Sequence, residues 1–213
     1  AMTMQILVPL HIYPDGNSAN LAVHTGAVAQ HLEAAVHALV LNVDFPPNHS
    51  PLADFILDAT SIIAGAKQRC HENGVALLKA IGTEMEQRKI ELHSSQVEYF
   101  PTTLTETVID IARYHDLSIL GIGQHDVALR GTAEEVLFGS GRPVLLVPED
   151  LQAGSYTHVA VAWDGSRVAA RAVTDAWSFL QRAASVTILC VSDEKPLPHH
   201  NIGSRLADYF AKT

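Results

Sequence analysis

Three short segments of the chain carry residue types that hold small ligands in parallel α/β proteins. Gly121 and Gly123 end one apolar run, and Gly131-Thr132 follows a few residues later. Pro9 to Gly16 and Val43-Asp44 follow two other apolar runs. Glycines let backbone N–H groups approach an anion, and a helix that begins beside them adds its positive end. Because the carboxyl ends of parallel strands meet at one edge, these segments predict a ligand site there.

The elements that must position these segments alternate along the chain. Strand-like runs lie at 4–10, 36–43, 91–98, 117–121 and 143–147. Helical spacing predicts helices over 19–34, 52–90, 102–115 and 132–138, the second of them bent near Gly65, Gly74 and Gly82. Such alternation is typical of right-handed parallel crossovers. We therefore predict the α/β class, with a doubly wound five-stranded parallel sheet of strand order 3-2-1-4-5 and strand 143–147 at an edge.

The chain then repeats its own beginning. Val159–Trp163 resembles Ile6–Leu10, and Asp164-Gly165 matches Asp15-Gly16. A repeat of this length indicates duplicated domains rather than a solenoid. We predict a complete first unit over 1–148, a linker over 149–156, and the N-terminal part of a second copy over 157–213. Because this second copy ends early, we expect either a fragment or a half-domain that leans on another surface.

Composition argues against several classes of function. The formal net charge is −9, with 23 acidic residues against 14 Lys and Arg, and no basic cluster offsets it. This balance disfavours binding to nucleic acid. No apolar run approaches the roughly 20 residues of a membrane helix, and we expect no signal peptide. Cys70 and Cys190 lie in different units, which predicts a reducing, cytoplasmic compartment.

The twelve histidines raise the question of a metal site. No pair of them has a recognised ligand spacing, so we expect structural or surface roles and no metal. The two cysteines are more typical of small buried hydrophobic residues. No nucleophile lies beside a base in the sequence, and nothing in it predicts catalysis.

Several motifs occur in order along the chain. They are DLSILGIGQ at 116–124, Gly131-Thr132, RPVLLVP at 142–148, and VAVAWDGS at 159–166. Together with the duplication, they resemble the universal stress proteins of the tandem kind, over essentially all of residues 4–213. The resemblance implies a stress-response role and, for ATP-binding members, a nucleotide site. The nucleotide-binding residues that it implies are Pro9, Asp15, Val43, Gly121, Gly123, Gly131, Thr132 and Asp164.

The chain departs from the ATP-binding pattern of that family in three places. The loop between Gly121 and Gly131 is shorter than the family's loop, and Gln124 stands where the family has glycine. The insertion at 11–14 displaces Asp15, so this acid is expected not to reach the ligand. The sequence therefore leaves it open whether the chain binds ATP, and it predicts no other cofactor.

The segment after Gly131 adds a physical objection. Thr132 and Glu135 have the spacing of a capping box, which predicts that a helix begins at Thr132. Glu134 and Glu135 would then lie where the phosphates bind. At ~5 Å and an effective dielectric near 20, each repulsion would amount to about 3 kcal/mol. In the second unit, Asp164 or Ser166 is expected to cap a helix, the alternative being half a nucleotide site.

These observations predict a cytoplasmic, non-catalytic, stress-response or ligand-binding protein whose first unit has a degenerate nucleotide site. The alternative is an ATP-binding switch that hydrolyses ATP slowly. Among partners we expect an adenine nucleotide in that alternative, and neither nucleic acid nor membrane. We also expect a homodimer in which strands 143–147 pair antiparallel about a two-fold axis, because an open apolar edge recruits another chain.

Overall fold

The protein forms two compact units, which are described separately. A computed structural model describes residues 3–13, 16–44, 59–123, 127–191 and 201–212. The first unit comprises Ala1–Gly154 and the second Ser155–Thr213. The division between them falls within the predicted linker 149–156.

The first unit contains a five-stranded sheet in which every pair of neighbouring strands is parallel. Its elements are β1 (Gln5–His11), α1 (Asn20–Leu32), β2 (Ala35–Val43), α3 (Ala59–Arg88), β3 (Leu92–Tyr99), α4 (Leu104–Ala112), β4 (Leu117–Ile122), α5 (Val127–Ser140) and β5 (Val144–Pro148). The strand order β3-β2-β1-β4-β5 confirms the predicted order, with β5 at an edge.

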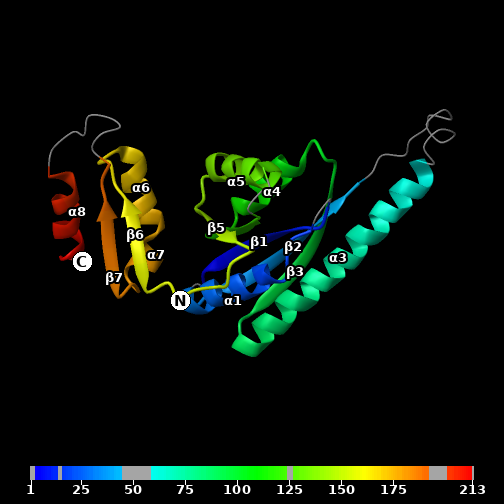
Figure 1. Cartoon of the computed structure of the whole chain (residues 1–213), viewed down its shortest axis with the longest axis horizontal. Helices are drawn as coiled ribbons and strands as arrows, with labels where there is room; N and C mark the ends of the chain where they lie inside the picture. The colour runs from blue at the N-terminus through cyan, green and yellow to red at the C-terminus, as the bar shows by residue number, and fades with distance from the viewer. Residues whose placement is uncertain (1–2, 14–15, 45–58, 124–126, 192–200, 213) are drawn as a thin grey trace. The chain divides into compact units, whose positions relative to one another are not determined.

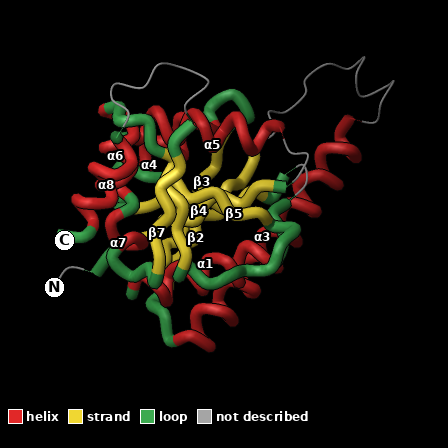
Figure 2. The backbone as a smooth tube through the Cα atoms, turned by 60° about the vertical axis from the view of Figure 1, so that its left-hand side comes forward, coloured by secondary structure: helices red, strands yellow, loops and turns green. Residues whose placement is uncertain are grey.

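Helices cover both faces of this sheet, as the doubly wound prediction requires. In Figure 1, α4 and α5 lie above the strands and α1 and α3 lie below them. Figure 2 shows the same layers from another side, with red helices on both sides of the yellow strands. The apolar strands follow from this arrangement, because a strand that is covered on both faces has no side exposed to water.

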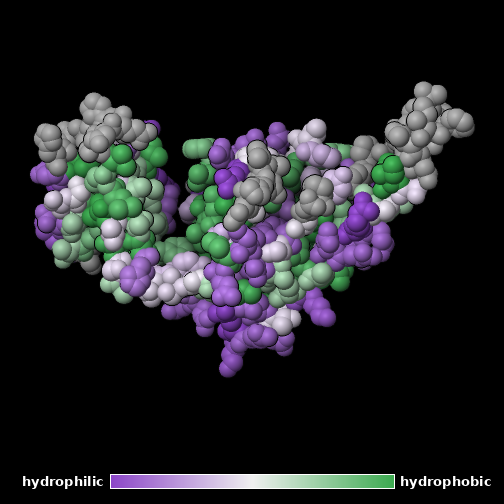
Figure 3. Space-filling view, in the orientation of Figure 1, coloured by the Kyte–Doolittle hydropathy of each residue, from purple (hydrophilic) through white to green (hydrophobic). Residues whose placement is uncertain are grey.

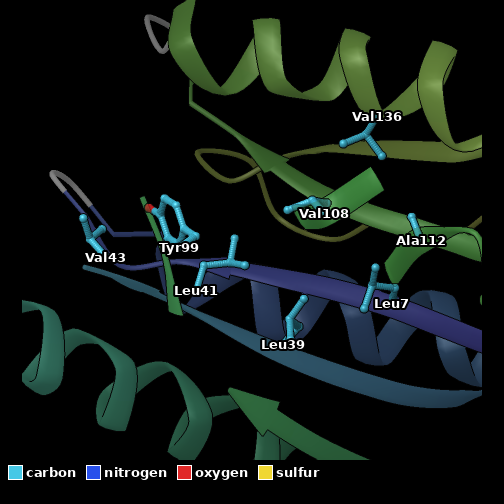
Figure 4. Close-up of a cluster of buried hydrophobic side chains, with 8 residues drawn as sticks. All are labelled: Leu7, Leu39, Leu41, Val43, Tyr99, Val108, Ala112 and Val136. Atoms are coloured by element: carbon cyan, nitrogen blue, oxygen red, sulfur yellow. The ribbon is translucent and has the colours of Figure 1, made fainter. Parts of the chain in front are cut away.

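The core beneath α4 and α5 shows how the apolar pattern becomes packing. Leu7, Leu39 and Leu41 rise from β1 and β2 toward Val108 of α4 and Val136 of α5 (Figure 4). All five side chains are 2% exposed or less. Burying one such side chain contributes about 1.5–3 kcal/mol, so this cluster is a main source of the unit's stability.

Two predicted helices differ from the observed ones. The helix predicted over 52–90 with bends is a continuous helix of 30 residues, α3, from Ala59 onward, and residues 52–58 lie outside the described residues. The prediction overestimated how strongly the glycines would bend the helix. A single glycine destabilises a helix by only about 1 kcal/mol, and the packing of α3 against α1 offsets this cost. The helix predicted over 132–138 begins earlier, at Val127.

Gly82 offers a direct test of this interpretation of α3. A Cβ built on Gly82 meets no atom within 4 Å. Gly82→Ala is therefore expected to stabilise the protein by about 0.5–1 kcal/mol, because alanine restricts the unfolded chain and favours the helix. Urea denaturation followed by circular dichroism measures the change. Gly139→Ala in α5 is the matched control and should stabilise less than Gly82→Ala, since its Cβ would lie 2.6 Å from Ile109 Cδ1 and that side chain has to move. A loss of stability in Gly82→Ala would contradict the prediction.

The second unit contains a smaller sheet and helices in the order strand–helix–helix–strand–helix. Its elements are β6 (His158–Ala162), α6 (Arg167–Asp175), α7 (Trp177–Leu180), β7 (Ser185–Leu189) and α8 (Ile202–Phe210). β6 and β7 are parallel neighbours. Val173, Leu180 and Leu206 form its buried core. Hydrophobic side chains also reach the surface of this unit, where Figure 3 shows them in green. Leu189 of β7, for example, is 52% exposed.

The start of α6 confirms the prediction that a helix begins after β6. Ser166 is the N-cap, and its Oγ accepts a hydrogen bond of 3.1 Å from the N–H of Ala169. Asp164 Oδ1 accepts from the N–H of Ser166 at 2.9 Å. Gly165 between them has φ of +73°, a conformation that favours glycine.

Candidate ligand site at the carboxyl end of the sheet

The carboxyl ends of β1 and β4 mark the point where the strand order reverses. The chain moves from β1 toward β2 on one side and from β4 toward β5 on the other. Open α/β sheets bind ligands at such a switch point. The end of β1 and Gly121 of β4 therefore define the candidate site, with Gly123 directly beyond β4.

The other predicted site residues belong to several different elements. Pro9 is buried within β1, and Val43 ends β2. Asp15 lies outside the described residues. Asp164 belongs to the second unit, where its carboxylate accepts the Ser166 N–H described above.

The end of β1 is tied to the start of α1 by a reciprocal pair of hydrogen bonds. The N–H of His11 donates to Asn17 Oδ1 at 2.7 Å, and the N–H of Asn17 donates to the carbonyl of His11 at 2.9 Å. Asn73 of α3 donates from Nδ2 to the carbonyl of Ile12 at 3.2 Å. These bonds hold residues 17–19, which lead into α1 and are called the α1 turn below, beside the strand ends.

The carboxylate of Glu149 lies at this α1 turn. Asn17 Nδ2 donates to Glu149 Oε1, and the N–H of Ser18 donates to Oε2. Asn20 Nδ2 donates to the backbone carbonyl of Glu149 at 2.8 Å, while the N–H of Glu149 donates to the carbonyl of Ile122 at 3.1 Å. The residue is 9% exposed. The α1 turn thus holds the side chain of Glu149, while Ile122 of β4 and Asn20 of α1 hold its backbone.

Gly121 provides the space that this carboxylate fills. A Cβ built on Gly121 would overlap the Glu149 carboxylate, and Glu149 Cγ would lie 2.9 Å from it. No side chain larger than that of glycine fits at position 121 without moving Glu149. The positive end of a helix attracts anions, and here the anion beside α1 is supplied by the chain itself.

The structure places Gly131 and Thr132 differently from the prediction. Both lie inside α5, after its start at Val127, and Thr132 is buried in the helix. The predicted capping box is therefore wrong, because Thr132 does not begin a helix. Glu134 and Glu135 are exposed in the middle of α5 and not at its N-terminus, so the charge objection based on them does not hold.

Sequence reasoning missed Glu149, which it assigned to the polar linker. A signal for it existed in the strand register. Gly121 pairs with Val147 and Ile122 with Pro148, so the residue after Pro148 must lie beside the end of β4. The run Asn17-Ser18-Ala19-Asn20 before the first helix supplies the donors that a carboxylate there would need.

A second polar cluster, His37, His93 and His115 with Ser95, lies away from this site. His115 Nδ1 lies 2.9 Å from the carbonyl of Ile111, which can only accept, so Nδ1 carries the proton. His115 Nε2 then accepts from His37 Nδ1–H at 2.9 Å, and His37 Nε2 accepts from the Ser95 hydroxyl at 2.7 Å. In this arrangement His37 is neutral. Burial, with smaller contributions from His115 and His93, lowers the pKa of His37 to about 4.

Two groups near the ends of β2 and β3 are held in their neutral forms. Burial, and to a lesser degree Cys70 and Tyr13, raises the pKa of Tyr99 to about 12. Burial also raises the pKa of the Cys70 thiol. A thiol with a raised pKa is a poor nucleophile at neutral pH, so Cys70 acts as a packing residue.

Two further features are lacking from the described ranges. Within them, no group of three or more His, Cys, Asp or Glu side chains is arranged to hold a metal ion. None of the described helices has the length and apolar character needed to cross a membrane.

Solved structures match the chain closely enough to identify its fold. A universal stress protein from Archaeoglobus fulgidus DSM 4304 superposes with a TM-score of 0.64 at 18% identity, over 98% of this chain and 72% of that one. The chain has the universal stress protein fold. The resemblance seen in its motifs is thus confirmed at the level of the fold.

Other structures with the universal stress protein fold match mainly at the length of one unit. One from Burkholderia pseudomallei has a TM-score of 0.48 at 22% identity, covering 70% of this chain and 98% of that chain. A universal stress protein in complex with cAMP has a TM-score of 0.44 at 19% identity, covering 69% and 98%. No protein-family model and no curated protein matches the chain. The fold assignment therefore depends on the first comparison.

Proposed function

We propose that this chain is a tandem universal stress protein that acts without catalysis, and that its first unit does not hold nucleotide phosphates. The observation that carries the proposal is the buried Glu149 carboxylate at the α1 turn, over Gly121. A phosphate at this turn would have to displace a negative group that already uses the Asn17 and Ser18 donors. The site is degenerate for nucleotides because its anion position is filled from within.

Electrostatics gives the size of the effect. At ~5 Å and an effective dielectric near 20, a phosphate charge and the Glu149 carboxylate repel by about 3 kcal/mol. That free energy corresponds to a loss of affinity of roughly 100-fold. Adenosine lacks the phosphates and does not meet this repulsion. The proposed ligand preference is therefore for molecules without a phosphate at this turn.

Titration calorimetry of the full chain with Mg-ATP and with adenosine tests the proposal. We expect ATP to bind with a Kd no better than ~100 μM, and adenosine to bind no more weakly than ATP. A low-micromolar Kd for ATP, or adenine nucleotide that copurifies with the protein, would instead support the ATP-binding switch. In that case, Glu149 would have to leave the α1 turn.

The tandem character is supported by the second unit. Its parallel β6 and β7, with helices after each strand, repeat the arrangement of β1, α1, β2 and α3. The matching Asp-Gly pairs at 15–16 and 164–165 lie after the first strand of each unit. We propose that the two units arose by duplication, and that Asp164 now serves the start of α6 and not a nucleotide.

A homodimer through β5 forms part of the same proposal. β5 ends the sheet and pairs only with β4 in the described part of the chain, and Leu146 on it is 46% exposed. An apolar edge strand has unpaired N–H and C=O groups that a second copy can pair antiparallel about a two-fold axis.

Light scattering of Leu146→Lys tests the dimer. We expect a wild-type dimer at micromolar concentration and a monomer for the variant, because a lysine on this strand places like charges together across the two-fold axis. Leu137→Lys on α5, where Leu137 is 45% exposed, is the control and should remain dimeric. A monomeric wild type would refute the dimer and leave the proposal on Glu149 intact.

A cytoplasmic location is proposed with the function. Cys70 and Cys190 are both free, the first buried and the second exposed. Unpaired cysteines are typical of proteins in a reducing compartment, which supports this location.

A further inference from the structure

The second unit contains a cavity of about 650 Å³ that is independent of the proposed function of the first unit. It is bounded by α6 and α8, with Trp163 after β6 and Trp177 of α7 in its lining. In the first unit, the corresponding helices α1 and α3 pack so closely that a Cβ at Gly26 of α1 would lie 2.7 Å from Arg88 Nε. At Gly26 the helices of the first unit are in contact, whereas α6 and α8 of the second unit leave a cavity between them.

Two hydrogen-bond donors of the cavity lining have no acceptor among the residues that the structure describes. Trp163 Nε1 is buried and has no hydrogen-bond partner in the described part of the chain. Arg205 of α8 also lines the cavity, its side chain is exposed, and no ion pair joins it to another described residue. The Trp163 N–H is covered by other protein atoms, so a ligand in the cavity meets the Arg205 guanidinium and not this atom.

The other polar groups nearby are already engaged. Thr174 Oγ1 donates to the carbonyl of Ala170 at 3.1 Å, and Asp175 pairs with Arg171 at 3.0 Å. Asp164, which precedes Gly165 of the lining, accepts the N–H of Ser166. The exposed Arg205 thus determines which polar group the cavity prefers, and that group is an anion.

The walls determine the shape of the rest of the ligand. Trp177 and Tyr209 have ring centroids 6.1 Å apart, and Ile202 and Leu206 add apolar surface from α8. These two rings pack against each other, and the aromatic surface that they present to the cavity favours contact with a further ring. We propose that this cavity binds a small flat aromatic ligand carrying a carboxylate, which accepts from Arg205.

The chain provides its own reporter for this site. It contains two tryptophans, Trp163 and Trp177, and both line the cavity. Tryptophan emission therefore reports on the second unit and on nothing in the first. Titration of the full chain with 3-phenylpropionate is expected to change the emission saturably, with a Kd below about 1 mM. The neutral analogue 3-phenylpropanol should bind about tenfold more weakly, because it lacks the charge that Arg205 attracts.

Two variants separate this site from general hydrophobic binding. Arg205→Gln should weaken 3-phenylpropionate about tenfold and leave 3-phenylpropanol unchanged. Arg167→Gln, an exposed arginine of α6 outside the lining, is the control for charge and should bind like the wild type. Far-UV circular dichroism checks that both variants fold.

Three results would overturn the proposal. The first is no saturable change of emission with 3-phenylpropionate, and the second is equal binding by the wild type and Arg205→Gln. The third is an emission that changes when the protein alone is diluted, since the cavity would then be an interface between copies of the chain. Each of these results leaves the proposal on Glu149 untouched, because no residue of the first unit is measured.

Discussion

Gly121→Ala is expected to destabilise the first unit by about 2–3 kcal/mol. The added Cβ would overlap the Glu149 carboxylate, which is held by the Asn17 side chain and the Ser18 N–H and has little freedom to move. Overpacking a filled site costs about 1–3 kcal/mol, and displacing a buried hydrogen-bonded carboxylate adds to that. Urea denaturation followed by far-UV circular dichroism measures the loss. Tryptophan emission, which comes only from the second unit, is the internal reference and should keep its own midpoint.

Combining Gly121→Ala with Glu149→Ala shows whether overlap with the Glu149 carboxylate causes the loss of stability. Glu149→Ala alone should also destabilise, because it leaves the donors of the α1 turn without their acceptor. Once the carboxylate is gone, Gly121→Ala should cost at least 1 kcal/mol less than it does in the wild type. Strictly additive effects of the two substitutions would mean that Gly121 is required for another reason.

Gly121 also illustrates what could be predicted from the sequence. The strand order followed from apolar runs alternating with helical spacing, since only a few topologies satisfy right-handed crossovers. Gly121 itself was assigned to a ligand site, where a glycine lets backbone N–H groups approach an anion. Its contact with the chain's own carboxylate was not evident, because the group that approaches Gly121 is Glu149, 28 positions along the chain. Long-range side-chain contacts of this kind leave no local periodicity.

The second large effect is a loss of stability in mild acid. His37 has a folded pKa of about 4, below the ordinary value of 6.5, because it is half-buried beside His115 and His93. The unfolded chain therefore takes up the proton first as the pH falls. The stability that the neutral His37 contributes is complete above pH 6.5 and is lost between there and about pH 4. The shift would correspond to about 3 kcal/mol, and solvent screening of this half-exposed group reduces the expected loss to about 1–2 kcal/mol.

Unfolding free energies measured at a series of pH values test this expectation. His37→Gln should be less stable than the wild type at pH 7, since Gln cannot reproduce the bonds to both Ser95 and His115. Its stability should depend less on pH over the same window. His71→Gln, an exposed histidine of α3, is the control and should keep the wild-type dependence. An unchanged acid dependence in His37→Gln would show that other groups cause it.

The candidate site was less predictable than the fold, for two physical reasons. The start of α5 was placed at Thr132 because a capping box is a local signal, yet the helix begins at Val127 and passes through Gly131. Glu149 was assigned to a linker because acidic residues after a strand are usually solvated. It is instead buried, since the ladder to Ile122 and the donors of the α1 turn hold it in place.

The central claim is that Glu149 fills the anion position of the first unit, and one comparison tests it most directly. Mg-ATP is titrated into the wild type, Glu149→Ala and Asp150→Ala, where Asp150 is the exposed acid next in the chain and its removal changes the net charge equally. The account predicts that Glu149→Ala, confirmed as folded by circular dichroism, binds ATP at least tenfold more tightly than the other two. This gain corresponds to about 1.4 kcal/mol, less than the full repulsion. Equal affinities for the two variants, or low-micromolar binding by the wild type, would contradict it.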